Sequence, residues 1–179
     1  PYASISVIDS DGNKNDDLKA FNPWEGTAEE TKRALTRIRE ALPNFCNARL
    51  LIGGKTLRQS PENPNGYIGD YPGIIEEALH TLRKGQPLFV AGGFGGAAAL
   101  LARELDLGPD LPIADAALTE MEQCKNYRNV LEEIKEKFDR LCTGLSADDL
   151  RLLATTQRAS ELGTLLAKGL ASPPAHSHN

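Results

Sequence analysis

The chain has 179 residues, of which 40% are hydrophobic and 25% charged, with a formal net charge of −5 and a pI near 5.3. This length fits one domain, or a core domain with an appendage. No apolar run approaches the roughly 18 residues that a membrane span requires, and the net charge disfavours non-specific nucleic-acid binding, which depends on clustered Lys and Arg. We therefore expect a cytoplasmic protein with neither a membrane nor a nucleic-acid partner.

Cysteines and histidines give no pattern of a metal site. Cys46, Cys124 and Cys142 are widely spaced and lack C-x-x-C pairing, so we expect reduced, buried thiols rather than a disulfide framework or a zinc site. His176 and His178 lie in a proline-rich tail that is not expected to pack. The expectation is no bound metal and no cofactor.

The amino-terminal part predicts one strand and one helix. β-branched residues over 2–8 predict the strand, and turn-forming residues predict a loop after it. Thr27 precedes Glu29 and Glu30 in the manner of a helix N-cap with an acidic first turn. An apolar stripe predicts a helix over residues 28–42.

The middle of the chain predicts a strand-helix-strand-helix order. Residues 48–54 are almost wholly apolar, which is typical of a strand buried on both faces of a parallel sheet. A loop over residues 55–72 is too long for a simple connector and is a candidate binding loop. An apolar stripe predicts a helix over residues 73–84 that Gly85 ends. "PLFVA" predicts the next strand and "GGAAALLARELDL" the next helix. The result is an α/β fold, a Rossmann-like parallel sheet flanked by helices.

The remaining sequence predicts a carboxyl-terminal helical extension. Residues 113–145 are charged with helical periodicity, Ser146 and Asp149 resemble a capping box, and residues 160–170 predict a last helix. We expect three regions: an α/β core over residues 1–110, the helical extension packing on it over 111–171, and a disordered tail over 172–179.

Glycine clusters follow both predicted strands of the middle region. Gly53 and Gly54 follow the first, and "GGFGG", residues 92–96, follows the second. In an open parallel sheet, the carboxyl ends of the strands and the following helix N-termini share one edge. Glycines there let a phosphate reach backbone N–H groups. A phosphate or ribose is therefore expected. The alternative, that small residues only let the helix pack closely on the sheet, is equally compatible with the spacing.

Charged side chains near these loops have two interpretations each. Lys55 directly follows the first glycine pair and is expected to point toward the crevice. Glu76 and Glu77 either contact a ribose or act in acid/base chemistry, or they only complement the helix dipole. Arg33 and Arg37 either face an anionic ligand or lie on a solvated helix face.

Aromatic residues are ambiguous in the same way. Trp24 and Phe94 either stack on a base or pack in the protein, and His80 is predicted at the surface. The weak catalytic candidates are Glu76 and Glu77. The predicted ligand-binding residues are Arg37, Gly53, Gly54, Lys55, Gly66, Tyr67, Gly69, Gly73, Glu77, Gly92, Gly93, Phe94, Gly95 and Gly96.

Three segments, "LLIGGK", "GYIGDYPGIIEEALHTLRKGQPLFVAGGFGGAA" and "GLSADDLRLLATT", resemble a bacterial branch of the SLOG superfamily, which is named for similarity to Smf/DprA proteins and LOG-type phosphoribohydrolases. The resemblance covers about residues 27–170. It implies a Rossmannoid sheet that binds nucleotides or nucleotide-derived signals, such as ADP-ribose relatives or cyclic nucleotides. It also implies a sensor role in prokaryotic antiphage systems beside TIR, Sir2 or other effector domains.

Two departures from that superfamily affect the expectation. LOG-type enzymes carry P-G-G-x-G-T-x-x-E where this chain has residues 69–77; Glu77 is retained, but the paired glycines and the threonine are not. The chain also has only one predicted strand before its first helix. We therefore expect residues upstream of Pro1, or another chain, to complete the fold. The effector then lies in the same longer protein or in a partner chain, and a homo-oligomer is expected.

Three functions are consistent with the sequence. The leading hypothesis is a nucleotide-derivative sensor, because no convincing nucleophile, base or metal constellation is present. The alternative is a LOG-like N-glycosidase or phosphoribohydrolase acting on a nucleoside monophosphate or an NAD-related substrate through Glu77 or Glu76. The third is an assembly module whose helices over residues 113–170 form an interface.

Overall fold

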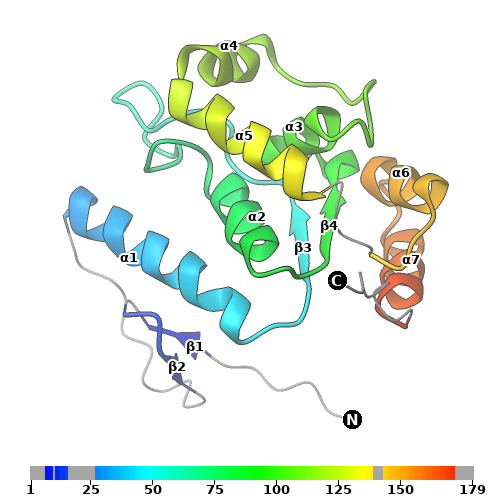
Figure 1. Ribbon diagram of the computed structural model, residues 1–179. Helices are drawn as coiled ribbons and strands as arrows, with labels where there is room; N and C mark the ends of the chain where they lie inside the picture. The colour runs from blue at the N-terminus through cyan, green and yellow to red at the C-terminus, as the bar shows by residue number, and fades with distance from the viewer. Residues whose placement is uncertain (1–6, 10, 16–26, 139–142, 172–179) are drawn as a thin grey trace. The chain divides into compact units, whose positions relative to one another are not determined.

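The computed structural model describes residues 7–9, 11–15, 27–138 and 143–171, which Figure 1 draws as ribbon. These residues belong to two compact units, Pro1–Asn47 and Ala48–Asn179. Several predictions fall outside the described residues: most of the strand over 2–8, Trp24, Cys142, and the tail with its two histidines. Each unit is described by itself.

The first unit contains a short hairpin and a capped helix. Strands β1 (Val7–Ile8) and β2 (Lys14–Asn15) pair antiparallel. Helix α1 (Ala28–Ala41) begins at a capping box, in which the Glu30 N–H donates to Thr27 Oγ1 and Glu30 Oε2 accepts from the Thr27 N–H. A 3-10 turn, η2 (Leu42–Asn44), follows. The predicted helix is confirmed. The loop predicted after the first strand was wrong at Lys14–Asn15, which form strand β2. These two residues carry no periodic pattern that could have indicated a strand.

The second unit is built on a parallel βαβ element. Strands β3 (Arg49–Ile52) and β4 (Leu88–Ala91) pair in parallel, with Ile52 opposite Ala91. Helix α2 (Gly73–Arg83) connects them, and Gly85 follows it with a φ of +70°. The predicted α/β fold with a parallel sheet flanked by helices is confirmed.

Two hydrophobic clusters cover the two faces of this sheet. Leu51 and Val90 join the larger cluster, to which helices α2, α3 (Gly96–Glu104) and α5 (Lys125–Phe138) contribute. Phe89 and Ala91 join the smaller one, with residues of α6 (Ala147–Thr155) and α7 (Ala159–Ala171). Figure 1 shows α6 and α7 beside β4, on the side away from α2.

The expectation that residues 48–54 are buried on both faces is only partly right. Leu51 is 1% exposed, but Ile52 is 44% exposed. Side chains alternate between the faces of a strand. Because Leu50 packs against the smaller cluster and Leu51 lies in the larger one, Ile52 is on the face covered by α6 and α7. The Ile52 side chain therefore extends beyond the part of the sheet against which α6 and α7 pack.

The predicted helical extension is present and contributes to the core. Helix α4 (Asp115–Gln123) precedes α5, and α5 buries Tyr127, Leu131 and Ile134 in the larger cluster. Helix α6 begins where Ser146 Oγ accepts from the Asp149 N–H, as predicted. The proposed domain boundary between residues 110 and 111 lies inside the second unit and stays a prediction.

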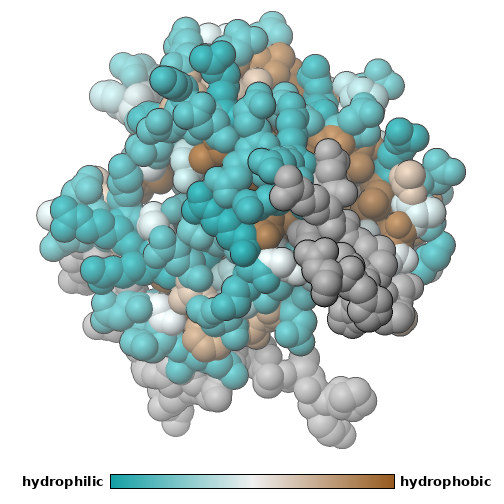
Figure 2. All heavy atoms as spheres, in the orientation of Figure 1, coloured by the Kyte–Doolittle hydropathy of each residue, from teal (hydrophilic) through white to brown (hydrophobic). Residues whose placement is uncertain are grey.

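The surface is predominantly polar on the face that Figure 2 shows, where apolar surface appears only in small separate areas. No helix within the described ranges is both long and apolar enough to cross a membrane.

Asp106 provides a test of the end of α3. It follows the C-cap Leu105 and is a non-glycine residue with a positive φ, +57°, in the position where helices most often place glycine. Replacing Asp106 with Gly removes the steric cost of that conformation, so we expect the free energy of unfolding to rise by about 0.5–1 kcal/mol in urea denaturation. Asp106→Ala serves as the control and should give no such gain. Equal effects of the two substitutions would contradict the explanation.

Candidate functional site

The glycine loops meet at one edge of the parallel sheet, as predicted. Ile52 and Ala91, the last residues of β3 and β4, lie opposite each other. Gly53 and Gly54 follow β3, and the 3-10 turn η3 (Gly92–Phe94) follows β4 and leads through Gly95 into α3. Residues 52–54 and 92–96 are called the glycine edge below.

Two backbone hydrogen bonds join the halves of the glycine edge. The Ala97 N–H donates to the Gly54 carbonyl at 3.1 Å, and the Ala98 N–H donates to the Gly53 carbonyl at 2.8 Å. These N–H groups belong to the first turn of α3 and have no partner within the helix. Because they already have carbonyl partners, they are not open donors for a phosphate.

Three glycines of the second loop are required by close contacts with other parts of the protein. A Cβ on Gly96 would lie 2.4 Å from the Gly54 carbonyl oxygen, and one on Gly93 would lie 2.3 Å from the Thr156 carbonyl oxygen. On Gly92 it would meet the Leu111 side chain at 2.7 Å. These glycines therefore let the β3 exit and the end of α6 approach the loop, which supports the close-packing alternative at these positions.

Gly53 and Gly95 are different. Their φ angles are +65° and +79°, and no atom lies within 4 Å of where a Cβ would stand. The neighbouring side chains Ile52 and Phe94 are 44% and 41% exposed. The glycine edge thus has an open part with accessible backbone and two exposed apolar side chains.

The loop over residues 55–72 is closed on itself. Lys55 Nζ donates to the Gly66 carbonyl at 3.1 Å, so the predicted crevice cation has a partner in its own loop. Arg58 and Tyr67 form an isolated β-bridge. A Cβ on Gly66 would lie 2.4 Å from the Arg58 backbone, and Gly66 is therefore required by loop closure. Gly69 has a φ of +130°.

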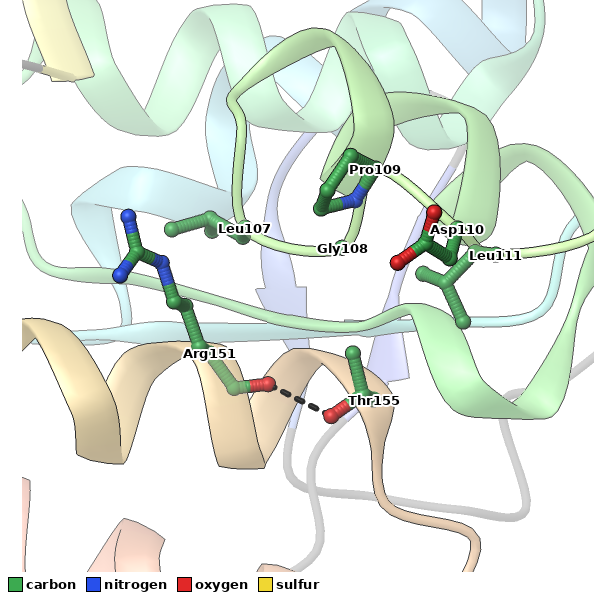
Figure 3. Close-up of a pocket in the computed structure, with 7 residues that line it drawn as sticks. All are labelled: Leu107, Gly108, Pro109, Asp110, Leu111, Arg151 and Thr155. Atoms are coloured by element: carbon green, nitrogen blue, oxygen red, sulfur yellow. Dashed lines mark hydrogen bonds between the residues drawn. The ribbon is translucent and has the colours of Figure 1, made fainter.

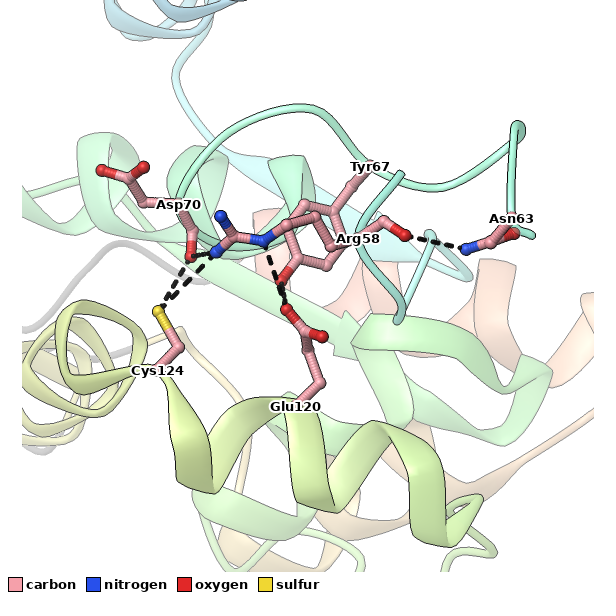
Figure 4. A network of polar contacts seen from close by, with 6 residues as sticks. All are labelled: Arg58, Asn63, Tyr67, Asp70, Glu120 and Cys124. Atoms are coloured by element: carbon pink, nitrogen blue, oxygen red, sulfur yellow. Dashed lines mark hydrogen bonds and ion pairs between the residues drawn. The ribbon is translucent and has the colours of Figure 1, made fainter. Parts of the chain in front are cut away.

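A polar cluster fastens this loop to α4 and its end, as Figure 4 shows. Glu120 Oε1 accepts from the Tyr67 hydroxyl at 2.6 Å and from Arg58 Nε at 3.4 Å. Arg58 Nη2 and Cys124 Sγ both donate to the Asp70 carbonyl, at 3.1 Å and 3.2 Å. Burial raises the pKa of Tyr67, and its bond to Glu120 raises it further. Tyr67 is 4% exposed and is held by these contacts within the protein; its contact with a ligand stays a prediction.

Tyr127 lies next to this cluster with an unsatisfied hydroxyl. The side chain is 0% exposed, its ring centroid is 6.4 Å from that of Tyr71, and its hydroxyl has no hydrogen-bond partner among the described residues. Burial raises the pKa of the Tyr127 hydroxyl, and the negative charges of Glu104 and Glu120 raise it further.

The two glutamates near the start of α2 differ in environment: Glu77 forms an ion pair and Glu76 is buried. Glu77 Oε2 lies 2.9 Å from Arg49 Nη1, and the Arg49 side chain is 9% exposed. Arg49 is the first residue of β3, so Glu77 is directed toward the other end of the strand from the glycine edge. Glu76 is 9% exposed. Gly73 begins α2 beside them.

Arg37 lies in the first unit and pairs with Asp11 at 3.1 Å; its contact with a ligand stays a prediction. His80, which was predicted at the surface, is half-buried on α2. No three His, Cys, Asp or Glu side chains of the described residues gather as metal ligands would.

A hollow of about 340 Å³, which no sequence pattern predicted, lies between the α3–α4 connection and α6, as Figure 3 shows. Residues 107–111, Arg151 and Thr155 line it. Leu111 also contacts the glycine edge at Gly92, so the two sites share a wall. "LGPDL" contains turn-forming residues, but no local pattern pairs it with a helix 40 residues later.

Gly96 and Gly85 test the close approach of the two halves. Both have a φ near +70°, but only Gly96 has backbone atoms where a Cβ would stand. Gly85→Ala should cost about 1 kcal/mol for the left-handed backbone, whereas Gly96→Ala should cost about 1–3 kcal/mol more, because the chains must separate. Chemical denaturation measures both. Equal losses of unfolding free energy in the two variants would contradict the close approach of the Gly54 backbone to Gly96.

Tyr67 and Tyr127 test the polar cluster. Tyr67→Phe removes the 2.6 Å hydrogen bond to Glu120 Oε1 and leaves that oxygen only the longer bond from Arg58 Nε, so we expect a loss of about 1–2 kcal/mol in unfolding free energy. Tyr127→Phe removes a hydroxyl that has no partner and should be neutral or stabilising by up to about 1 kcal/mol. Thermal unfolding of both variants at one pH distinguishes them; a larger loss from Tyr127→Phe would contradict the assignment.

Comparison with known proteins identifies the family. The model of a family described as SLOG cluster2 matches residues 4–162. No curated protein and no solved structure matches the chain significantly. The parallel βαβ element and its glycine loops lie within the matched residues. The chain belongs to the SLOG cluster2 family and is therefore a Rossmann-like domain of the nucleotide-related SLOG superfamily.

Proposed function

We propose that the chain is a sensor domain that binds a nucleotide derivative, such as an ADP-ribose relative or a cyclic nucleotide, at the glycine edge. One observation carries the proposal: at the carboxyl ends of two parallel strands, Gly53 and Gly95 have positive φ angles and open space in place of a Cβ. Ligands of open α/β sheets bind at this edge. Membership in the SLOG family supports a nucleotide-related guest.

The proposed output is an effector domain, in the same longer protein or in a partner chain, within a prokaryotic antiphage system. A homo-oligomer is part of this proposal. The shared wall supports a route for the signal, because Gly92 contacts Leu111 and Gly93 contacts the carbonyls of Thr155 and Thr156 at the end of α6. A ligand that shifts η3 would therefore act directly on the α3–α4 connection and on α6.

A sensor explains the acidic residues better than the N-glycosidase alternative does. A carboxylate that attacks or stabilises a ribosyl centre must reach the ligand. Glu77 is paired with Arg49, which is itself 9% exposed, and Glu76 is 9% exposed. Both side chains are therefore poorly placed for a substrate at the glycine edge.

Ligand-dependent stability tests the function. We expect ADP-ribose, AMP, NAD or a cyclic nucleotide to raise the unfolding temperature, since a ligand at 100 times its Kd adds about 2.7 kcal/mol. After incubation with AMP or NAD, chromatography should detect no free base or nicotinamide. Release of base would establish the enzyme instead. The absence of stabilisation by every nucleotide would contradict the proposed function.

A matched pair of variants locates the site. Asparagine tolerates a positive φ, and both Gly53 and Gly85 have open space beside them. Gly53→Asn places a side chain in the glycine edge. Gly85→Asn places the same side chain just after the carboxyl end of α2, outside the glycine edge. We expect only Gly53→Asn to weaken nucleotide binding in calorimetry. Equal affinity of the two variants would place the ligand elsewhere.

A further inference from the structure

The hollow between the α3–α4 connection and α6 has the size and the lining of a small-molecule site. Its volume is about 340 Å³. Ligand pockets typically measure roughly 300–1,000 Å³ and are mostly apolar, with a few polar groups that fix the orientation of the ligand. Leu107, Pro109 and Leu111 supply the apolar lining. None of the residues predicted to bind a nucleotide lines the hollow, so it is separate from the glycine edge.

Close packing fixes the floor of the hollow. A Cβ on Gly108 would lie 2.6 Å from Leu111 Cδ1 and 3.1 Å from Thr155 Cγ2, so the α3–α4 connection lies directly against α6. The Leu111 N–H donates to the Gly108 carbonyl at 3.1 Å, and Leu107 is only 9% exposed. The floor is therefore formed by packed residues and not by loose side chains.

Two charged side chains at the hollow have no partner within the described part of the chain. Arg151 and Asp110 both line the hollow, and neither side chain takes part in a hydrogen bond or ion pair with another described residue. By contrast, Arg158, which follows α6, lies 3.0 Å from Glu161 Oε1. Arg151 and Asp110 are therefore available to a ligand without the loss of a protein contact.

The two charges lie at opposite ends of the hollow. Figure 3 shows the Arg151 guanidinium beside Leu107 and the Asp110 carboxylate beside Leu111, with apolar lining between them. The Thr155 hydroxyl donates to the Arg151 carbonyl at 2.8 Å and so leaves no further free donor. A neutral apolar ligand would take water from both charges without replacing it, which is unfavourable. A ligand that carries both signs of charge would pair with both.

We propose that the hollow is a second ligand site, for a small zwitterion with an apolar body, of which a short peptide is the simplest example. Its anionic group pairs with Arg151, its cationic group pairs with Asp110, and its apolar body packs on Leu107 and Leu111. This inference goes beyond the proposed function and does not rest on nucleotide binding. Because Leu111 also contacts Gly92, the bound zwitterion touches a residue that supports the glycine edge.

Titration of the whole chain with peptides, followed by amide NMR shifts, tests the site. The probes are Ala-Leu-Ala, its N-acetyl form, its carboxyl-terminal amide and triglycine. We expect Ala-Leu-Ala to bind with a Kd of about 1 mM or tighter and to shift the amides of Leu107, Gly108 and Thr155 more than those of Gly53 and Gly95. Each blocked form should bind about 2- to 5-fold more weakly, the range for loss of one exposed ion pair. Triglycine should bind at least about fivefold more weakly, because it lacks the leucine side chain.

Charge-removing variants assign each end of the peptide. Arg151→Gln should weaken Ala-Leu-Ala by about 2- to 5-fold and leave the affinity of the amidated peptide unchanged. Asp110→Asn should have the same effect on Ala-Leu-Ala and leave the N-acetyl form unchanged. Arg128→Gln is the control, because Arg128 is exposed on α5 and does not line the hollow. Thermal unfolding checks that all three variants fold.

Three results would overturn the inference. The first is that Ala-Leu-Ala at about ten times the expected Kd shifts no amide around the hollow. The second is that the blocked forms bind as tightly as the zwitterion. The third is that Arg151→Gln and Asp110→Asn bind Ala-Leu-Ala as the control does. Nucleotide binding at the glycine edge is measured separately, so failure of the proposed function and failure of this inference are distinguishable.

Discussion

The structure of the site depends on two backbone hydrogen bonds, from the Ala97 and Ala98 N–H groups to the Gly54 and Gly53 carbonyls. They join the exit of β3 to the start of α3 and give two orphan donors of that helix a partner. Gly96 is required because the two backbones approach within the space of a Cβ. The same bonds occupy the Ala97 and Ala98 N–H groups and leave Gly53 and Gly95 as the open positions of the glycine edge.

The burial of α3 follows from this close approach. Residues from Ala97 to Ala102 are each no more than 1% exposed, so this helix is surrounded by protein rather than lying on a surface. A helix that is buried on all sides must be apolar on all sides, and its alanines let β4, α2 and α5 pack closely. The glycines and the alanines therefore serve one packing arrangement, in which the Ala97 and Ala98 N–H groups of the first turn of α3 bond to carbonyls of the protein itself.

The sequence predicted those features that depend on neighbouring residues. The N-caps at Thr27 and Ser146 and the stop at Gly85 are local, and all three are confirmed. The pairing of Arg49 with Glu77 spans 28 residues, and that of Tyr67 with Glu120 spans 53. No local pattern encodes such contacts, which is why the sequence did not predict the protein partners of Glu77 and Tyr67. Composition likewise cannot tell a glycine that faces a ligand from one that faces backbone.

Amide hydrogen exchange of the ligand-free protein, followed by NMR, tests the central claim most directly. If the Ala97 and Ala98 N–H groups are bonded to Gly54 and Gly53, they should exchange as slowly as the amides of β4, despite their place in the first turn of a helix. Added inorganic phosphate should leave their exchange unchanged. Rapid exchange that phosphate suppresses would show open anion-binding donors and would contradict the account.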